Sequence, residues 1–477
     1  MLSIVSFEVV RLHDVYTYDL SLFDNSGSRD ISILYGDNGS GKTTLLKVLY
    51  HLLSSSGDRG HLTALSKIPF HRAKAILSDG TVVSVERASP PSGFPMRFSI
   101  ARPNEIHASY HFVPERYKAG VLEEVIDKEI MKKYASAKAY RFRNESHNMR
   151  TVREAILENF SEAAHNAYCE ALKKLSITIY FLGTERRILS DAVEQQWSAH
   201  NSRDQLERPE EQIAMLRAAY LRDALQRGAR YLNRQIIQAS NAGSKNVNDI
   251  FADIFRRIVR DDKPEPDKKP RTARALAVNL RWLQRRQRNF VKLGMSPDLD
   301  VGSFIADLKV ENGPANDLVA KVLEPFIATI RARLDAMEPI RESIAIFVSS
   351  LNGFLKYKSI DYHPSTGFVI SGPLGEPLDV QHLSSGEQQL LLIFCSVLAA
   401  NETPNIFIID EPEISLNVKW QRELLGALRK ISSDAKNQLL ISTHSIELLT
   451  QHSESIVALD PLISRNTLPL FSSEDFE

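Results

Sequence analysis

The stretch that decides the fold is "ISILYGDNGSGKTTLLKVL", which runs from Ile31 to Leu49. Its first five residues form an apolar run that predicts a buried strand, and the sequence that follows predicts a helix over about 42–53. Between the two, residues 36–43 read "GDNGSGKT" and satisfy the pattern G-x-x-x-x-G-K-[ST]. Between a strand and a helix, this pattern is typical of a phosphate-binding loop.

Each residue type in this loop suits a triphosphate. Glycines at 36, 39 and 41 let the backbone wrap closely around phosphates, and the start of the following helix adds positive potential. Lys42 neutralises the β- and γ-phosphate oxygens, and Thr43 offers its hydroxyl to Mg²⁺. ATP and Mg²⁺ are therefore the predicted cofactors. The nucleotide-binding residues predicted in this segment are Gly36, Asp37, Asn38, Gly39, Ser40, Gly41, Lys42, Thr43 and Thr44.

A second, acidic motif completes this chemistry in the sequence "NIFIIDEPE", residues 405–413. The four apolar residues 406–409 predict a buried parallel strand, and open α/β sheets bind ligands at the carboxyl ends of such strands. Asp410 suits the Mg²⁺ shell, and Glu411 suits the base that orients or deprotonates an attacking water. We therefore predict Thr43 and Asp410 as metal ligands, and Lys42 and Glu411 as catalytic residues.

Composition excludes several classes of protein. The chain has 477 residues, of which 43% are hydrophobic, enough for a core in each of two or three lobes. Basic and acidic residues number 59 each, so any attraction to nucleic acid must be local. The two cysteines, Cys169 and Cys395, form no Cys-x-x-Cys pair and fit a reducing cytosol. No apolar run reaches the ~20 residues of a membrane helix, and we expect a soluble, cytoplasmic protein.

The pattern along the chain predicts three parts. Residues 1–190 contain strands and the Asp79–Gly80 turn of a hairpin, and "ITIYFLG" at 177–183 predicts another strand of the main sheet. Residues 191–355 have a helical period, broken by the prolines of 261–270, and form a predicted helical insertion. Residues 356–477 begin with a hairpin-like segment and carry the remaining motifs.

The segment "LSSGEQQ", residues 383–389, resembles the signature sequence of ABC-type ATPases. This resemblance implies an α/β ABC-type ATPase head with a mixed sheet. It also implies that Ser384 and Gly386 cap the γ-phosphate held by a partner chain, because a serine and N–H groups at a helix start form an anion site. Ser385 stands where many members have glycine. The phosphate-binding loop would then be only half of a site.

Two further segments fit the same resemblance. His444 follows an apolar strand 34 residues after Asp410 and matches the switch histidine that contacts the γ-phosphate, so it joins the predicted catalytic residues. Residues 415–417 occupy the place of the D-loop, although Asn417 stands where relatives often carry histidine or aspartate. The glutamine that senses Mg²⁺ has no clear counterpart. Its substitutes would be Glu185 and Arg186, with Gln195 and Gln196 further on.

Spacing separates the members of this superfamily. A transporter subunit needs only about 100 residues between loop and signature, whereas here the interval from Gly36 to Leu383 is 347. An SMC or repair ATPase would place a long coiled coil there, commonly with a zinc hook, but no sustained heptad or Cys-x-x-Cys occurs. OLD-type nucleases carry a TOPRIM domain after the ATPase, whereas only 33 residues follow His444.

The chain accordingly resembles the stand-alone OLD-like ATPases of prokaryotic anti-phage systems, most of all the AriA ATPases of PARIS and next the PtuA ATPases of Septu. The resemblance implies a homo-oligomer of ATP-sandwiched dimers, often a hexamer, with slow, switch-like turnover. It also implies control of a separate nuclease, of TOPRIM or HNH type, or of a toxin. The alternative is a DNA repair or recombination ATPase of the SMC/RecF type that binds DNA directly.

Local charge indicates where a partner could bind. Between Arg256 and Lys292 there are 13 Lys and Arg residues against four acids. A segment of this density suits duplex DNA, or an acidic phage protein that imitates DNA. The other interpretation is a solvated helical face that pairs with acids elsewhere in the chain.

Overall fold

The chain folds into two compact units in the computed structural model, Met1–Pro209 with Ala400–Glu477, and Glu210–Ala399. The structure describes residues 2–22, 31–55, 60–88, 93–102, 105–137, 153–154, 156–184, 188–189, 209–243, 252, 255–256, 273–298, 300, 302, 314–401, 405–432, 437–450, 452–460 and 462–463.

The first unit contains a six-stranded sheet in the order β14-β3-β13-β12-β8-β9. Its strands are β3 (Ile31–Tyr35), β8 (Thr178–Leu182), β9 (Ile188–Leu189), β12 (Asn405–Asp410), β13 (Gln438–Thr443) and β14 (Ile456–Ala458). All neighbours are parallel except β8 and β9. All six residues of β13 are buried, as expected for a parallel strand covered on both faces. The predicted mixed sheet is confirmed.

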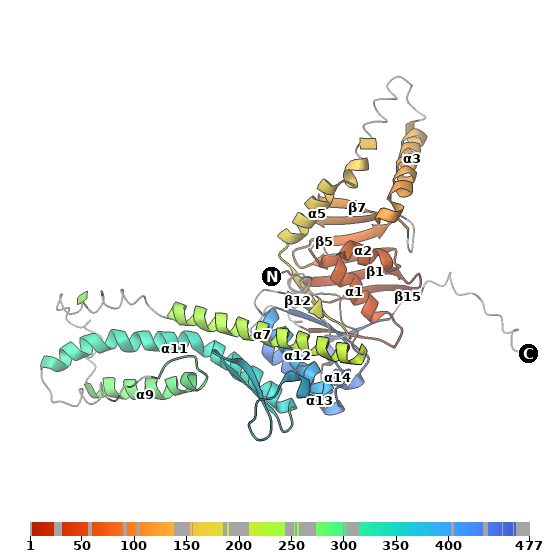
Figure 1. The fold of residues 1–477 in the computed structure, drawn as a ribbon. Coiled ribbons are helices and arrows are strands. Elements are labelled where there is room, and N and C mark those ends of the chain that lie inside the picture. The colour runs from red at the N-terminus through yellow and green to blue at the C-terminus, as the bar shows by residue number, and fades with distance from the viewer. Residues whose placement is uncertain are drawn as a thin grey trace, which may run out of the picture. The chain divides into compact units, whose positions relative to one another are not determined.

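A seven-stranded antiparallel sheet forms the rest of this unit's β-structure (Figure 1). Its order is β15 (Leu462–Ile463), β2 (Tyr16–Ser21), β1 (Ile4–Leu12), β4 (Arg72–Leu77), β5 (Val82–Arg87), β6 (Met96–Arg102) and β7 (Glu105–Phe112). The predicted hairpin joins β4 and β5, where Gly80 has φ +80° and Asp79 accepts a hydrogen bond from the Thr81 N–H at 2.9 Å.

Helix α1 (Lys42–Leu53) contacts strands of both sheets. It is therefore apolar on almost every side, as a helix buried between two layers must be. Its buried residues are Lys42, Leu45, Leu46, Val48, Leu49, Tyr50, Leu52 and Leu53. This packing fixes the start of α1, and with it the phosphate-binding loop, against the main sheet.

The first unit also contains other helices within its described residues. They are α2 (His61–Lys67), α3 (Lys118–Ala137), α5 (Glu162–Lys174), α13 (Val418–Ser432) and α14 (Ile446–Leu449), with 3₁₀ turns η2 (Glu115–Tyr117) and η4 (Ser453–Ser455). Helix α5 lies along β7 (Figure 1).

Arg87 at the end of β5 is buried with its guanidinium at the C-terminus of α2. It donates hydrogen bonds to the carbonyls of Leu65, Ser66 and Ile68 at 3.0, 3.2 and 2.7 Å. It also lies 4.8 Å from the ring centroid of Phe70. Burial lowers the pKa of Arg87 to about 10, so the group is still charged at neutral pH. A cation at this position donates hydrogen bonds to the last carbonyls of the helix and is attracted by the partial negative charge at the helix C-terminus.

The second unit begins with a helical arm made of α7 (Pro209–Gly243), α9 (Ala273–Lys292) and α11 (Pro314–Phe354). Helices α9 and α11 lie side by side (Figure 1), and the predicted helical insertion is confirmed. Then follow β10 (Ser359–His363), β11 (Gly367–Ser371), η3 (Val380–His382) and α12 (Ser385–Ala400). Asn352 joins α11 to β10, because its side chain bonds both the N–H and the carbonyl of Ile360.

The grouping differs from the sequence-based division at about 190 and 355. The hairpin β10–β11 and the signature segment fall within the unit of the helical arm, since that unit extends to Ala399. The division into parts at 1–190, 191–355 and 356–477 remains a prediction. Within the described ranges, no helix has both the length and the apolar character needed to cross a membrane.

We predict that Arg87→Ala lowers the free energy of unfolding by about 3 kcal/mol, because three helix-end carbonyls lose a charged donor inside the core. Chemical denaturation followed by tryptophan fluorescence measures the change. Arg72→Ala is the control, since its partly exposed ion pair with Glu8 should contribute less than about 1 kcal/mol. Equal losses in the two variants would contradict a structural role for Arg87.

Candidate nucleotide-binding site

The predicted phosphate-binding loop joins β3 to α1 and has the backbone that its glycines permit. Gly39 and Gly41 have φ of +84° and +77°, in the left-handed region that favours glycine. A Cβ added at Gly39 would meet no atom within 4 Å, so backbone conformation, and not space, is what favours glycine there. Asp37, Asn38 and Gly39 are exposed at the tip of the loop.

Tyr18, on strand β2 of the antiparallel sheet, is hydrogen-bonded to the phosphate-binding loop. Its hydroxyl donates a short hydrogen bond to the carbonyl of Ser40. Burial and the neighbouring Tyr16 raise the pKa of Tyr18 to about 12, so the hydroxyl stays a donor at neutral pH. Thr44, in the first turn of α1, has its hydroxyl 3.5 Å from Nε2 of His13. Sequence analysis did not single out Tyr18, because nothing in β2 distinguishes it from a core aromatic.

Lys42 is 5% exposed, and its ammonium lies within the curve of the loop. Nζ donates to the carbonyls of Gly36 and Asp37 at 2.8 and 2.9 Å. An ammonium has three N–H groups, so one donor remains for a phosphate oxygen. The loop and its lysine therefore fit a bound phosphate chain.

Thr43 and Asp410 meet across the start of α1 and the end of β12. The hydroxyl of Thr43 donates to Oδ2 of Asp410 at 2.7 Å, and Ser442 donates a short bond to Oδ1 of the same carboxylate. Ser442 is the partner of Asp410 in the β12–β13 register. A hydroxyl and a carboxylate are the hard oxygen donors that Mg²⁺ prefers, so this pair fits the predicted metal. Ser442 is a neighbour that sequence analysis missed.

Glu411 follows Asp410 with φ +48°, an uncommon conformation for a residue other than glycine and one that concentrates at functional sites. Its N–H donates to the carbonyl of Ser442 at 3.0 Å. Burial and the negative charges of Asp410 and Glu413 raise the pKa of Glu411, while His444 and Lys42 oppose that shift. A carboxylate with a raised pKa is suited to accept a proton from water.

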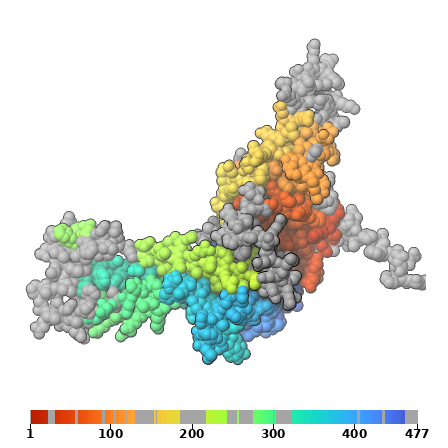
Figure 2. Space-filling model, viewed as in Figure 1, coloured from red at the N-terminus to blue at the C-terminus, as the bar shows by residue number. Residues whose placement is uncertain are grey.

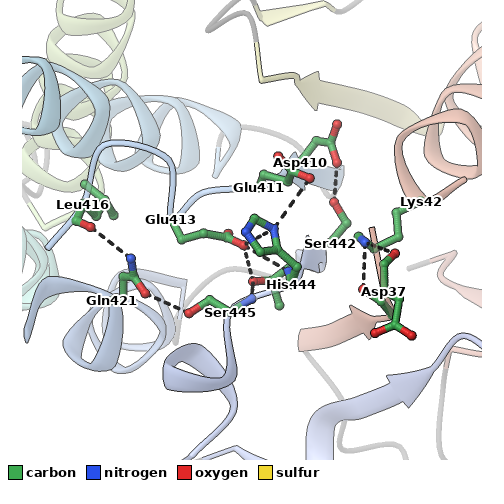
Figure 3. Close-up of polar contacts among 12 residues, drawn as sticks. Asp37, Lys42, Asp410, Glu411, Glu413, Leu416, Gln421, Ser442, His444 and Ser445 are labelled. Atoms are coloured by element: carbon green, nitrogen blue, oxygen red, sulfur yellow. Dashed lines mark hydrogen bonds and ion pairs between the residues drawn. The ribbon is translucent and has the colours of Figure 1, made fainter. Parts of the chain in front are cut away.

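His444 lies at the end of β13 beside two carboxylates. Its Nδ1 is 3.3 Å from Oε1 of Glu413 and 3.7 Å from Oε1 of Glu411 (Figure 3). The His444 side chain is 44% exposed, whereas that of Glu413 is 5% exposed. The structure thus brings the predicted Lys42, Thr43, Asp410, Glu411 and His444 into one unit, together with Glu413, which sequence analysis did not single out.

Hydrogen bonds also tie the turn after His444 to the predicted D-loop (Figure 3). Ser445 donates through its hydroxyl to Oε1 of Gln421 at 2.7 Å, and Gln421 donates to the carbonyl of Leu416 at 2.9 Å. Asn417 caps α13 by accepting from the Trp420 N–H at 3.0 Å. The asparagine that departs from the common D-loop sequence therefore has a local structural role.

Ser384 and Gly386 lie in the second unit, at the start of α12. Ser384 is exposed, and its hydroxyl accepts from the Glu387 N–H at 3.4 Å while Glu387 accepts from the Ser384 N–H at 2.7 Å. This reciprocal pair is a capping box. Lys358 pairs with Glu387 at 2.7 Å and stabilises it. Glu185 and Arg186, the predicted substitutes for the Mg²⁺-sensing glutamine, lie outside the described residues, as do Gln195 and Gln196 further along the chain.

Parts of this chain are similar to known proteins. The family model described as "AAA domain, putative AbiEii toxin, Type IV TA system" matches residues 31–148 and 227–450, well over half of the chain. A putative ABC transporter ATP-binding protein of Pyrococcus horikoshii, PH1815, is 32% identical over 79 residues, which are 17% of this chain and 27% of that protein. The molybdenum import ATP-binding protein ModC of Yersinia pestis is 32% identical over 78 residues, 16% of this chain and 21% of ModC.

These curated relatives match the chain over only about a quarter of their own length. Among solved structures, the Smc head domain of Pyrococcus furiosus with an extended coiled coil, bound to the C-terminal domain of ScpA, is 12% identical. The alignment covers 97% of both chains at a TM-score of 0.37. A similarity this weak supports no inference about the present chain.

We predict that Lys42→Ala weakens ATP binding by about 10- to 100-fold, because a charged hydrogen bond to phosphate contributes about 1.5–3 kcal/mol. Titration calorimetry with ATP and Mg²⁺ measures the affinity. Lys47→Ala is a matched control, since Lys47 is an exposed lysine of the same helix. If both variants bind ATP as tightly as the wild type, the loop is not the nucleotide site.

Proposed function

Since this chain belongs to the AAA-domain family described as a putative AbiEii toxin of a type IV toxin–antitoxin system, and is an ABC-type P-loop protein, we propose that it binds ATP with Mg²⁺ and hydrolyses it slowly. The observation that carries the proposal is the bond between Thr43 and Asp410. It joins the phosphate-binding loop to the acidic motif at 2.7 Å, although the two residues are 367 positions apart.

Each residue of the site has a chemical task in this proposal. The N–H groups of the loop and Lys42 bind the phosphate chain and orient the γ-phosphate. Mg²⁺, held by Thr43 and Asp410, would neutralise charge on the phosphate oxygens. Glu411 accepts the proton of the attacking water, and its raised pKa brings it closer to the working pH for that step. His444 would contact the γ-phosphate, the role that its resemblance to the switch histidine of ABC-type ATPases implies.

We further propose that the site is completed in trans by a second copy of the chain. Ser384 is exposed immediately before the 16-residue helix α12, where the N–H groups of a helix start attract anions. Together with Gly386 it would cap the γ-phosphate of ATP bound to the partner. The assembly is then a homo-oligomer of ATP-sandwiched dimers, of which a hexamer is one form, and ATP closure acts as its switch.

The biological role that we propose is control of an anti-phage effector. The resemblance of the motifs to OLD-like defence ATPases such as AriA and PtuA supports it, and the toxin named in the family description points the same way. The effector would be a separately encoded nuclease of TOPRIM or HNH type, or a toxin. Turnover is slow in this scheme because the useful output is the state of the assembly.

A second candidate function, a DNA repair or recombination ATPase of the SMC/RecF type, is favoured by one surface. Arg281, Arg285, Arg288 and Lys292 of α9 are exposed, and their spacings of four, three and four residues place them on one face of the helix. The opposite face is buried through Leu276, Leu280, Leu283, Gln287 and Phe290. Helix α9 contains no acidic residue. We call these four residues the α9 basic face.

The neighbouring Arg286 differs from the α9 basic face because it forms ion pairs. Arg286 donates to Glu338 of α11 at 3.0 Å and to Asp335 of the same helix, so its charge is neutralised within the arm. No ion pair is found for the four residues of the α9 basic face among the described residues. Trp282 is 49% exposed beside them. Figure 2 shows the green surface of α9 open to view along the arm. Of the predicted basic segment, residues 257–272 lie outside the described residues.

The occupant that we propose for the α9 basic face is the phosphate backbone of duplex DNA. Four cations on one stripe, without an ion pair to any residue that the structure describes, complement a row of phosphates, and arginine is well suited to bind them. In the defence role this face would sense DNA, and in the repair role it would hold the substrate. An acidic protein that imitates DNA is the competing occupant.

We predict that two inactive variants, Lys42→Ala and Ser384→Arg, recover hydrolysis when mixed. Each mixed dimer has one intact site, formed by Lys42 of one copy and Ser384 of the other. Random pairing should restore about a quarter of the wild-type rate, measured by phosphate release. Mixing two preparations of the same variant is the control. No recovery, although mixed dimers are detected by mass spectrometry, would rule out completion in trans.

We predict that Arg281→Glu with Arg288→Glu weakens binding of duplex DNA by about 10-fold or more at low salt, and that wild-type affinity falls steeply as salt rises. Fluorescence anisotropy of a labelled duplex gives both quantities. Arg217→Glu with Arg230→Glu, two exposed arginines of α7, makes the same charge change as a control. Equal weakening in both variants would show a non-specific charge effect. Binding of a DNA-imitating acidic protein but not of DNA would identify the other occupant.

A further inference from the structure

Glu413 is a buried carboxylate that no role proposed above uses. Its side chain is 5% exposed, and one oxygen, Oε1, gathers three contacts from the end of β13. The hydroxyl of Thr443 donates to it at 2.6 Å, the N–H of His444 donates at 3.0 Å, and Nδ1 of His444 lies 3.3 Å away. Two of the three contacts are with the same histidine, one through its backbone and one through its ring.

Burial of this acid needs an explanation, because an ionised carboxylate loses hydration when it is buried and is stable there only where hydrogen-bond donors compensate the loss. The hydrogen bonds of Glu413 differ from those of the predicted metal ligand Asp410. Asp410 already accepts hydrogen bonds from Thr43 and Ser442 on its two oxygens, whereas among the described residues Glu413 accepts hydrogen bonds from Thr443 and His444. Glu411 and Glu413 therefore have different roles in the site.

The ring nitrogen of His444 has two possible acceptors. Oε1 of Glu413 lies 3.3 Å from Nδ1, and Oε1 of Glu411 lies 3.7 Å from the same atom (Figure 3). The shorter distance, with the backbone bond at 3.0 Å holding the same residue, favours Glu413 as the acceptor. An Nδ1–H that bonds Glu413 leaves Glu411 without a competing hydrogen bond.

We propose that Glu413 is a positioning residue for His444. It accepts the hydrogen bond of Nδ1–H, which fixes the ring and the tautomer and leaves Nε2 for the γ-phosphate side. The same hydrogen bond keeps Nδ1–H of His444 from bonding the carboxylate of Glu411, the proposed base. This inference rests on the roles proposed for His444 and Glu411. It assigns to Glu413 the part that a second group plays in orienting a catalytic imidazole.

Glu413→Ala tests the inference on the full chain. Without the acceptor, the ring can turn toward Glu411 or change tautomer, so we expect kcat for ATP to fall by about 10- to 100-fold. KM and the affinity for ATP should stay within about twofold, because Glu413 touches none of the proposed nucleotide-binding residues. A rise in KM at unchanged kcat would contradict the inference.

The tautomer gives a readout that a purely structural role would not move. Ring ¹⁵N chemical shifts distinguish Nδ1–H from Nε2–H, and the signal of His444 is identified by its absence from His444→Gln. We expect the Nδ1–H form in the wild type at a pH where the ring is neutral, and its loss in Glu413→Ala. An Nε2–H form in the wild type would overturn the proposal, even if no Glu413 variant folds.

Two further variants separate positioning from other effects. Glu413→Gln keeps an acceptor oxygen and should restore most of kcat and the Nδ1–H form. If it keeps the tautomer but loses kcat as fully as Ala does, the carboxylate acts by its charge and positioning is wrong. Thr443→Val removes the other side-chain donor to the same oxygen and should leave the tautomer unchanged.

Failure of the proposed function would look different. A wild-type chain that does not hydrolyse ATP would contradict that function, while the ring ¹⁵N shifts would still decide whether Glu413 holds His444.

Discussion

The hydrogen bond between Thr43 and Asp410 is the interaction on which the proposed site depends. It can form only if the first helix after the phosphate-binding loop and the end of β12 meet, and the sheet order makes that possible by placing β13 between β3 and β12. Helix α1 is buried between the two sheets, so its first turn cannot move away without exposing a row of leucines. The core thus positions two side chains that are 367 residues apart in sequence.

Those parts of the fold that the sequence predicted have strong local patterns. The strand, glycine loop and helix of 31–53 follow one another without interruption. The dipeptide Asp79–Gly80 is one of the few that favour the tight turn of a β-hairpin. The run 406–409 is a buried parallel strand, as its unbroken apolar sequence predicted. In each case adjacent residues carry enough information to specify the element.

The contacts that sequence analysis missed depend instead on tertiary position. Ser442 reaches Asp410 only because β12 and β13 are in register, and Tyr18 reaches Ser40 only because β2 lies under the loop. Glu413 stands two residues after the proposed base, where it could equally have been a solvated acid. Its burial, and the bond from the backbone of His444, set it apart. A polar residue that acts on another polar residue has no periodic signal of its own.

The proposed mechanism joins a half-site in each copy to a serine-bearing turn in the other, and one structure determination tests this most directly. It is the structure of Glu411→Gln with ATP and Mg²⁺, in whatever assembly the protein forms. The mechanism predicts that Ser384 and the N–H of Gly386 lie within hydrogen-bonding distance of a γ-phosphate that contacts Lys42 of another copy. A loaded assembly in which residues 383–389 point away from every triphosphate would contradict it.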